Sequence, residues 1–221
     1  MRIRPNFAFE RELWGRGVTA IAGVDEVGVG AFAGPVIAAA VILTPDSMID
    51  GLADSKLLSA KGREKLFAVI TAGAVAIGIG RIDVEEVDRL NIYWAAMKAR
   101  RRAVEALTTT PAHILVDDKR QIAGCRVQQT AVVDGDALSA SIAAASIVAK
   151  VTRDSVMEKY AQIYPGYGFE RHKGYGMIEH IAALARFGPL PLHRWSFAPV
   201  WRTGEAQPQL ALWRDESGGR G

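Results

Sequence analysis

The segment IAGVDEVGVGAFAGPVIAAAVIL, residues 21–43, decides the fold class that we expect for this chain. Its first apolar run, 21–24, stops at Asp25-Glu26, and a stretch rich in glycine separates it from a second apolar run at 36–43. Short apolar runs divided by glycine and proline are typical of two strands joined by a tight turn. The segment therefore predicts a buried strand that ends in two carboxylates.

Outward from this segment, the apolar pattern predicts strands that alternate with helices. Further strands are expected where apolar residues run together or alternate, at 74–82, 113–116 and 131–133. Helices are expected where apolar residues recur every three or four positions, at 10–14, 59–72, 83–107, 139–160 and 179–187. Ser59 is a typical helix N-cap, and residues 164–176 form a loop rich in glycine and tyrosine. The alternation favours an α/β fold.

Length and composition agree with one large globular domain. The chain has 221 residues, of which 49% are hydrophobic and 23% are charged, close to the averages for soluble domains. We expect a basic N-terminal segment at 1–18, a main domain at 19–203 that includes C-terminal helices, and a flexible tail at 204–221.

Charge and cysteine content limit the class of protein. The net charge of +3, from 27 Lys and Arg against 24 Asp and Glu, permits a polyanionic partner without requiring one. The single cysteine, Cys125, excludes a disulfide scaffold and fits a reducing cytoplasm. No apolar stretch reaches the roughly 18 residues of a membrane span. We therefore expect a cytoplasmic monomer that binds no membrane.

The acidic residues at strand ends carry the main functional signal. Asp25, Glu26 and Asp117 follow buried strands directly, and Asp136 follows a third strand after a short gap. Adjacent strands bring their ends together, and clustered carboxylates repel one another unless cations lie between them. Such ligands suit Mg²⁺ or Mn²⁺, and two such ions can activate water and stabilise the leaving oxygen of a phosphodiester. The alternative is that these acids only form turns and loop caps.

Basic and aromatic residues accompany this pattern. Lys56 follows Asp54-Ser55 and suits a phosphate contact as a point charge. Lys150 lies on the helix that begins just after Asp136, and residues 171–175 place cations beside Tyr175. This combination suits contact with phosphates together with stacking on a sugar or base. The alternative for Tyr175 is a tyrosine that packs within its own loop.

Six segments resemble the ribonuclease HII family, the type 2 ribonucleases H, in the order in which that family has them. They are 23–36, 54–59, 114–117, 135–154, 167–176 and 193–197. The run ASIVAKVTRD at 145–154 is the most specific of them. Together the segments span about residues 19–200.

The resemblance implies a ribonuclease H-like fold, with a mixed central sheet flanked by helices and a helical C-terminal extension. It implies endonucleolytic cleavage of RNA paired to DNA, and of duplex DNA at an embedded ribonucleotide, leaving a 5′-phosphate and a 3′-hydroxyl. The family's metal-binding and catalytic carboxylates fall on Asp25, Glu26, Asp117 and Asp136, with two Mg²⁺ or Mn²⁺ ions expected at them.

The resemblance also implies substrate-binding residues. The family's turn that faces the ribose 2′-hydroxyl falls on Gly28, Val29 and Gly30, its junction-stacking tyrosine on Tyr175, and a lysine near the phosphates on Lys56. From charge and position, Lys150, His172 and Lys173 complete the predicted set of phosphate and substrate contacts.

Two positions depart from the family pattern. Val29 stands where the family usually has arginine, which predicts weaker substrate binding or altered junction selectivity. It also keeps open two rivals, a catalytically weak hybrid-binding protein and another nuclease of the ribonuclease H fold. Asp118 stands where glycine is common. Its carboxylate either tunes metal affinity or points to solvent, and we favour solvent.

The tail carries one short motif. Gln209–Trp213 (QLALW) is an apolar island in a polar segment and resembles the peptides that bind bacterial sliding clamps. The alternative is that this island folds back onto the body of the protein. The motif predicts a sliding clamp as a possible partner.

Overall fold

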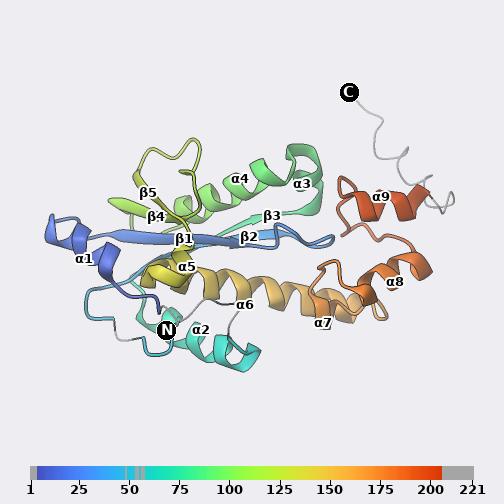
Figure 1. Ribbon diagram of the computed structural model, residues 1–221, viewed down its shortest axis with the longest axis horizontal. Helices are drawn as coiled ribbons and strands as arrows, with labels where there is room; N and C mark the ends of the chain where they lie inside the picture. The colour runs from blue at the N-terminus through green and yellow to red at the C-terminus, as the bar shows by residue number, and fades with distance from the viewer. Residues whose placement is uncertain (1–3, 48, 53–54, 56–57, 206–221) are drawn as a thin grey trace.

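The central sheet is mixed, with β1 in its middle. The computed structural model describes residues 4–47, 49–52, 55 and 58–205. Within them the sheet has five strands in the order β3-β2-β1-β4-β5 (Figure 1). The strands are β1 (Ile21–Val27), β2 (Val36–Ile42), β3 (Ala76–Ile82), β4 (His113–Asp117) and β5 (Gln128–Val132). β1, β2 and β3 are antiparallel neighbours, whereas β4 runs parallel to both β1 and β5.

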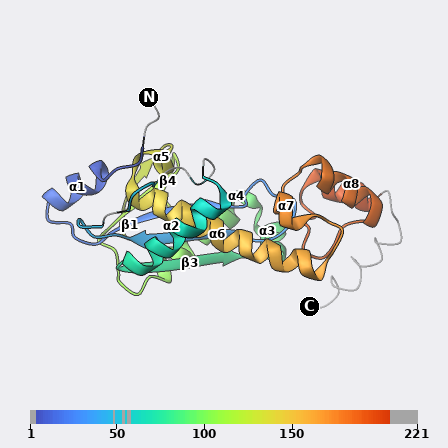
Figure 2. The ribbon, with the colours of Figure 1, turned by 90° about the horizontal axis from the view of Figure 1, so that it is seen from below.

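Helices cover both faces of the sheet and continue beyond its end. The helices are α1 (Ala8–Gly15), α2 (Ala60–Gly73), α3 (Val84–Leu90), α4 (Ile92–Glu105), α5 (Gly135–Leu138), α6 (Ala140–Ile163), α7 (Phe169–His172), α8 (Ile178–Phe187) and α9 (Ala198–Glu205). α3 and α4 lie on one face, and α2 and α6 lie on the other. Seen from below, α6 crosses the sheet and leads to α7 and α8 at one end (Figure 2). The expected α/β fold with a helical C-terminal part is confirmed.

Small residues let the helices approach the sheet closely. The core between α6 and the sheet contains alanines from both layers, such as Ala39 on β2 and Ala144 on α6. At Gly23 on β1, a Cβ atom would lie 2.1 Å from the backbone carbon of Ser141 on α6. Only glycine permits this contact, which presses α6 against the strand that carries Asp25.

The predicted long helix at 83–107 is wrong, because the chain forms two helices that meet at Asn91. Asn91 has a positive φ of 66°, and its side chain accepts hydrogen bonds from the backbone N–H groups of Tyr93 and Trp94 at 3.0 and 3.2 Å. It therefore interrupts one helix and caps the next. The helix α9 was not predicted, and α7 lies within the predicted loop at 164–176.

Strand β1 is longer than its apolar run. It continues to Val27, since Asp25 and Glu26 pair with Ala39 and Ala38 of the antiparallel strand β2. The two acids therefore lie within the strand and not after it. The strand β5 likewise begins before the predicted start at residue 131, because its pairing with β4 extends to Gln128.

The N-terminal segment packs on the main body through α1. Phe9, Leu13 and Trp14 pack against a core cluster that includes Leu115 of β4. Glu10 is buried and accepts hydrogen bonds from the hydroxyl groups of Ser139 and Ser141, each at 2.6 Å. No helix among the described residues is both long and apolar enough to cross a membrane. The tail motif at 209–213, and residues 206–221 in general, lie outside the described residues.

Candidate metal and substrate site

Three of the four predicted carboxylates converge at one end of the sheet. Asp25, Asp117 and Asp136 each place an oxygen within 4.8 Å of the others. Asp25 comes from β1, Asp117 ends the parallel neighbour β4, and Asp136 lies on α5, directly after β5. The parallel pairing of β1 with β4 and of β4 with β5 brings the three positions to the same edge. We call these three residues the carboxylate cluster.

Burial makes the negative charges of the carboxylate cluster unfavourable unless cations neutralise them. Asp25 and Asp136 are 8% and 6% exposed. Burial raises the pKa of Asp25 well above its ordinary value, and the charges of Glu26 and Asp117 raise it further. Oxygen-only donors that are buried and repel one another fit hard divalent cations such as Mg²⁺ and Mn²⁺. The residues present therefore suit the metal ions that the sequence predicted.

Hydrogen bonds hold the cluster in place. The backbone N–H of Glu26 donates to Asp25 Oδ1 at 2.7 Å, and that of Gly135 donates to Asp117 Oδ1 at 2.8 Å. Ser146 on α6 hydrogen-bonds to Asp25 and lies 2.9 Å from the hydroxyl oxygen of Ser55. Sequence reasoning missed Ser146, although a serine in an alanine-rich buried helix is a signal for such a contact.

Glu26 is not one of the three grouped acids, and its carboxylate pairs with Arg100 of α4. Its Oε2 accepts from Nε of Arg100 at 2.5 Å, and Nη1 of Arg100 donates to Oδ2 of Asp118 at 2.5 Å. The interpretation that Asp118 points to solvent is wrong, because its side chain is three-quarters buried and paired. Arg100 was missed by the sequence analysis, where it stands as one of three successive arginines with no feature that marks it out.

The glycine-rich turn keeps its backbone, while the side chain of Val29 packs inward. Gly28 has a φ of +91°, and a Cβ there would lie 2.3 Å from Nε of Arg153. Val29 is half-buried against the core beneath α4. Gly30 is exposed, with open space around the position of a Cβ. The turn therefore presents backbone to the solvent at Gly30, with no charge from residue 29.

Two buried arginines support this turn from below. Arg153 on α6 donates to the carbonyl oxygens of Pro35, Ala33 and Lys173 at 3.0, 3.0 and 2.9 Å. Arg194 donates to the carbonyl oxygen of Gly34 from two nitrogens, at 3.1 and 2.8 Å, and to that of Val29 at 3.0 Å. Burial lowers the pKa of Arg194 to about 9, and the charge of Arg153 also lowers it. These two arginines hold the backbone of the turn in position, and their guanidinium groups bond to carbonyl oxygens and not to a phosphate.

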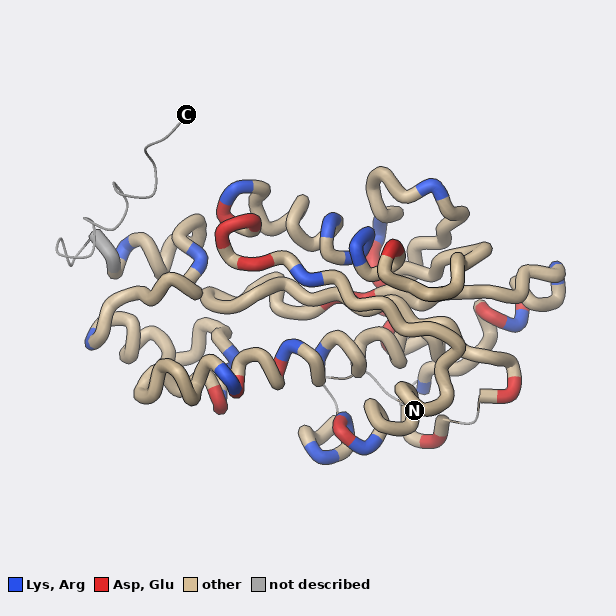
Figure 3. Tube along the Cα trace, turned by 180° about the vertical axis from the view of Figure 1, so that it is seen from behind, with Lys and Arg blue, Asp and Glu red and all other residues tan. Residues whose placement is uncertain are grey.

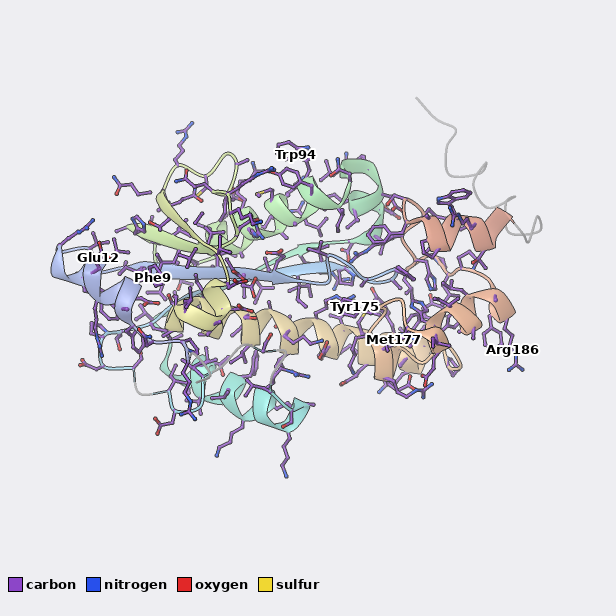
Figure 4. The ribbon with its side chains drawn as sticks, in the orientation of Figure 1. Phe9, Glu12, Trp94, Tyr175, Met177 and Arg186 are labelled. Carbon is purple, nitrogen blue, oxygen red and sulfur yellow. The ribbon has the colours of Figure 1, made fainter. Side chains whose placement is uncertain are left out.

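Tyr175 lies beside the turn and above two cations. A β-bridge joins it to Ala31, and its ring centre lies 5.2 Å from Cζ of Arg153 and 5.9 Å from Nζ of Lys150. Figure 4 shows Tyr175 next to Met177, between the sheet layer and the helices below it. A cavity of about 620 Å³ opens there, lined by Lys150, Arg171, Lys173, Tyr175 and Met177 among others.

The predicted phosphate-binding lysines are paired within the chain. Nζ of Lys150 donates to Oδ1 of Asp154 at 2.7 Å, and Nζ of Lys173 donates to Oε1 of Glu158 at 2.7 Å. Burial lowers the pKa of Lys150. Among the described residues, lysines and arginines occur on several elements and alternate with acidic residues (Figure 3). Lys56 and Asp54 lie outside the described residues.

The prediction that His172 contacts a phosphate is wrong for this structure. His172 is 7% exposed, its Nε2 lies 2.7 Å from the carbonyl oxygen of Tyr167, and its Nδ1 accepts from the backbone N–H of Gly174 at 3.1 Å. Both ring nitrogens are therefore committed to backbone, and burial lowers the pKa of the ring. His172 supports the loop that carries Tyr175.

Known proteins share this sequence and this fold. The profile of the family Ribonuclease HII matches residues 22–200. A ribonuclease HII of Bacillus licheniformis is 52% identical over 193 residues, which are 87% of this chain and 75% of that protein. The crystal structure of ribonuclease H2 from Pyrococcus horikoshii has a TM-score of 0.72 at 26% identity, and the match covers 85% of this chain and 98% of that chain.

A further structure, described as the PCNA:RNase HII complex from Archaeoglobus fulgidus, matches in fold. Its TM-score is 0.67 at 23% identity, and the match covers 83% of this chain and 94% of that chain. The family profile spans the carboxylate cluster, the glycine-rich turn and the loop of Tyr175 together. The chain is therefore a ribonuclease H and belongs to the ribonuclease HII family.

Proposed function

We propose that this ribonuclease cleaves the RNA strand of RNA–DNA hybrids, and duplex DNA at an embedded ribonucleotide, by hydrolysis that depends on divalent metal ions. The products carry a 5′-phosphate and a 3′-hydroxyl. The observation that carries the proposal is the buried cluster of Asp25, Asp117 and Asp136, in a chain of this family. The glycine-rich turn begins three residues after Asp25, and Ala31, which follows the turn, is bridged to Tyr175, so a short stretch of chain links the carboxylates to the predicted substrate-binding residues.

In this proposal Asp25, Asp117 and Asp136 hold two Mg²⁺ or Mn²⁺ ions, with Glu26 as a fourth ligand. Bound there, the ions would activate a water molecule and stabilise the leaving 3′ oxygen. Asp25 is the central ligand, and Ser146 and the backbone of Glu26 hold its carboxylate in place. The mutual repulsion of these acids supports the proposal, because a protein that only binds hybrids has no need of it.

Recognition of ribose requires contact with the 2′-hydroxyl group, which distinguishes RNA from DNA locally. The glycine-rich turn at Gly28–Gly30, which is exposed at Gly30, is suited to that contact, and the ring of Tyr175 is suited to stacking at the junction. Lys150 and Lys173 line the adjacent cavity, and in this proposal they exchange their partners Asp154 and Glu158 for the phosphates of the substrate. Lys56 belongs to this set by family resemblance.

One experiment tests the reaction against its two rivals. Duplexes that hold one ribonucleotide, a long hybrid or no ribonucleotide are incubated with Mg²⁺, with Mn²⁺ or with chelator, and the products are resolved on a gel. We expect cleavage of the first two duplexes only, and none with chelator. A gel-shift of the same duplexes without any cleavage would identify a hybrid-binding protein, and cleavage of the duplex without a ribonucleotide would identify another nuclease.

We further propose that the chain acts as a cytoplasmic monomer that binds a sliding clamp through Gln209–Trp213. The motif QLALW and the archaeal neighbour that is described in complex with PCNA support the clamp partner. A pull-down with the clamp should lose the protein when residues 206–221 are deleted, while cleavage of a short hybrid persists. Retention of the truncated protein on the clamp would overturn this assignment.

A further inference from the structure

Arg100 is a buried cation that joins the ends of the two strands that carry the metal ligands. It is 4% exposed and donates to Oε2 of Glu26, to Oδ2 of Asp118 and, at 3.3 Å, to the backbone carbonyl of Asp117. Glu26 directly follows Asp25 on β1, and Asp118 directly follows Asp117 on β4. One guanidinium group therefore contacts the chain beside two of the three members of the carboxylate cluster.

Asp118 is held rigidly as the second partner of Arg100. Its Oδ1 accepts from the backbone N–H groups of Lys119 and Arg120, at 2.5 and 3.2 Å, while its Oδ2 faces Arg100. The pairing with Arg100 and these backbone bonds lower the pKa of Asp118, although its burial opposes them. A buried guanidinium group is costly unless it is paired and hydrogen-bonded on several sides. Asp118 is one of the two carboxylates that pair with Arg100, so the guanidinium group is shared between Asp118 and Glu26.

We propose that Arg100 and Asp118 form a charge-compensated pair that positions Glu26 beside the carboxylate cluster and sets the affinity of the cluster for divalent cations. This inference rests on the proposed metal site. Arg100 is a positioning residue, since it acts through Glu26, and Asp118 cancels the charge that Arg100 would otherwise impose on a bound ion.

The charges predict effects of opposite sign. In the wild type, Arg100, Glu26 and Asp118 together carry one net negative charge; without the charge of Asp118 the group is neutral, which weakens the binding of metal ions nearby. Without Arg100, Glu26 and Asp118 add uncompensated negative charge, which strengthens it. One unit charge acting on a divalent ion through largely aqueous surroundings changes affinity by about threefold to tenfold.

Calorimetric titration of the full chain with Mn²⁺ alone measures this directly, without substrate. Asp118→Asn keeps the size of the side chain and the Oδ1 acceptor, and should weaken Mn²⁺ binding by about threefold to tenfold. Arg100→Gln should strengthen it by a similar factor. The double variant Arg100→Gln with Asp118→Asn should return to within about twofold of the wild type, because the two charges cancel.

A thermal melt of each variant separates this role from a structural one. Arg100→Gln should lower the melting temperature and yet bind Mn²⁺ more tightly, a combination that loss of structure does not produce. The matched control is Asp134→Asn, an exposed acid at the same edge of the sheet that should change Mn²⁺ affinity less than twofold.

Two outcomes would overturn the inference. The first is an unchanged Mn²⁺ affinity in Asp118→Asn. This test remains valid even if Arg100→Gln fails to fold, because the asparagine variant keeps the contacts with the backbone. The second is weaker binding in all three variants. Failure of the wild type to bind Mn²⁺ would instead overturn the proposed metal site itself, so the two failures are distinguishable.

Discussion

At the scale of single residues, the site is a balance of buried charges. Asp25 lies at its centre, and its pKa is raised first by burial and then by the charges of Glu26 and Asp117. An acid whose folded pKa is raised destabilises the folded chain once it ionises. In the absence of metal, the contribution of Asp25 to stability is therefore most favourable at low pH and is lost as the pH rises through the pKa of this group, whereas the buried histidines discussed below act in the opposite direction.

This balance predicts the behaviour of Asp25→Asn. The substitution removes the central negative charge, so we expect turnover to be abolished. We also expect the free energy of unfolding of the metal-free protein to rise by about 1 kcal/mol at pH 7. Cleavage assays and denaturant titrations with chelator measure the two effects. Normal cleavage by the variant with added Mg²⁺ would remove the metal hypothesis at its centre.

A second residue-scale prediction concerns Val29. Arginine at this position would add a charge-assisted hydrogen bond to the substrate, worth about 1.5–3 kcal/mol. Val29→Arg should tighten binding to a duplex with one ribonucleotide by about tenfold to a hundredfold, relative to a plain hybrid. Val133→Arg, at an exposed position elsewhere, adds the same charge and should leave that preference unchanged. If Val29→Arg alters neither affinity nor preference, the inferred role of residue 29 is wrong.

At the scale of elements, the break between α3 and α4 places Arg100. Asn91 ends one helix and caps the next, and Trp94 in the first turn of α4 remains half-exposed (Figure 4). Arg100 lies in the middle of α4, whose direction is set by that cap. In a single continuous helix over 83–107, Arg100 would lie in a different position relative to the sheet. The cap at Asn91 therefore helps to place Arg100 beside Glu26 and Asp118.

The cap supports a prediction on stability. Asn91→Ala removes the side-chain acceptor and places alanine at a positive φ, so it should lower the free energy of unfolding by about 1–2 kcal/mol. Asn91→Gly loses the same acceptor but tolerates the backbone angle, and should cost only a few tenths of a kcal/mol. Urea titrations compare the two. Equal losses in both variants would show that the backbone angle contributes nothing.

At the scale of the whole molecule, buried histidines join α8 to the loops that precede and follow it in the C-terminal part of the chain. Nδ1 of His180 lies 2.9 Å from the carbonyl oxygen of Tyr175 and donates to it, so its Nε2 accepts from Nε2 of His193 at 3.0 Å. Nδ1 of His193 accepts from the backbone N–H of Leu190 at 2.8 Å. Both histidines are fully buried and neutral in this arrangement, and they hold the loop that carries Tyr175.

This arrangement predicts acid sensitivity. Burial lowers the pKa of His180 to about 4 and, together with the charge of His180, lowers that of His193 to about 3. The unfolded chain binds these protons from about pH 6.5 downwards, so stability is fully present above that pH and falls as the pH drops. His180 alone accounts for about 3 kcal/mol at pH 4. Thermal melts between pH 7.5 and 4.5 measure the loss.

The matched variant for this prediction is His180→Gln, which cannot titrate in this range. It should be less stable than the wild type at pH 7.5 and should lose less stability between pH 7.5 and 4.5. An identical loss in both proteins would show that His180 does not cause the acid sensitivity.

The sequence by itself determined the α/β alternation, most of the strands and helices, and the four acids as candidate ligands. These depend on apolar periodicity and on which residues follow buried strands, and both are local properties of the chain. The resemblance to a known family added the predicted activity, and it showed that Val29 stands where that family usually has arginine. The break at Asn91 was missed because the apolar pattern continues across it, although an asparagine with a positive φ is itself a local feature.

Only the tertiary structure decided how the charged residues pair. Arg100 meets Glu26 across 74 positions and Asp118 across 18, and Arg194 reaches Gly34 across 160. His172 was predicted to contact a phosphate because cations flank it in the sequence, yet the fold buries it. No pattern in sequence specifies which of several cations a given carboxylate will face, because burial and packing of distant elements decide whether a polar group meets water or a partner.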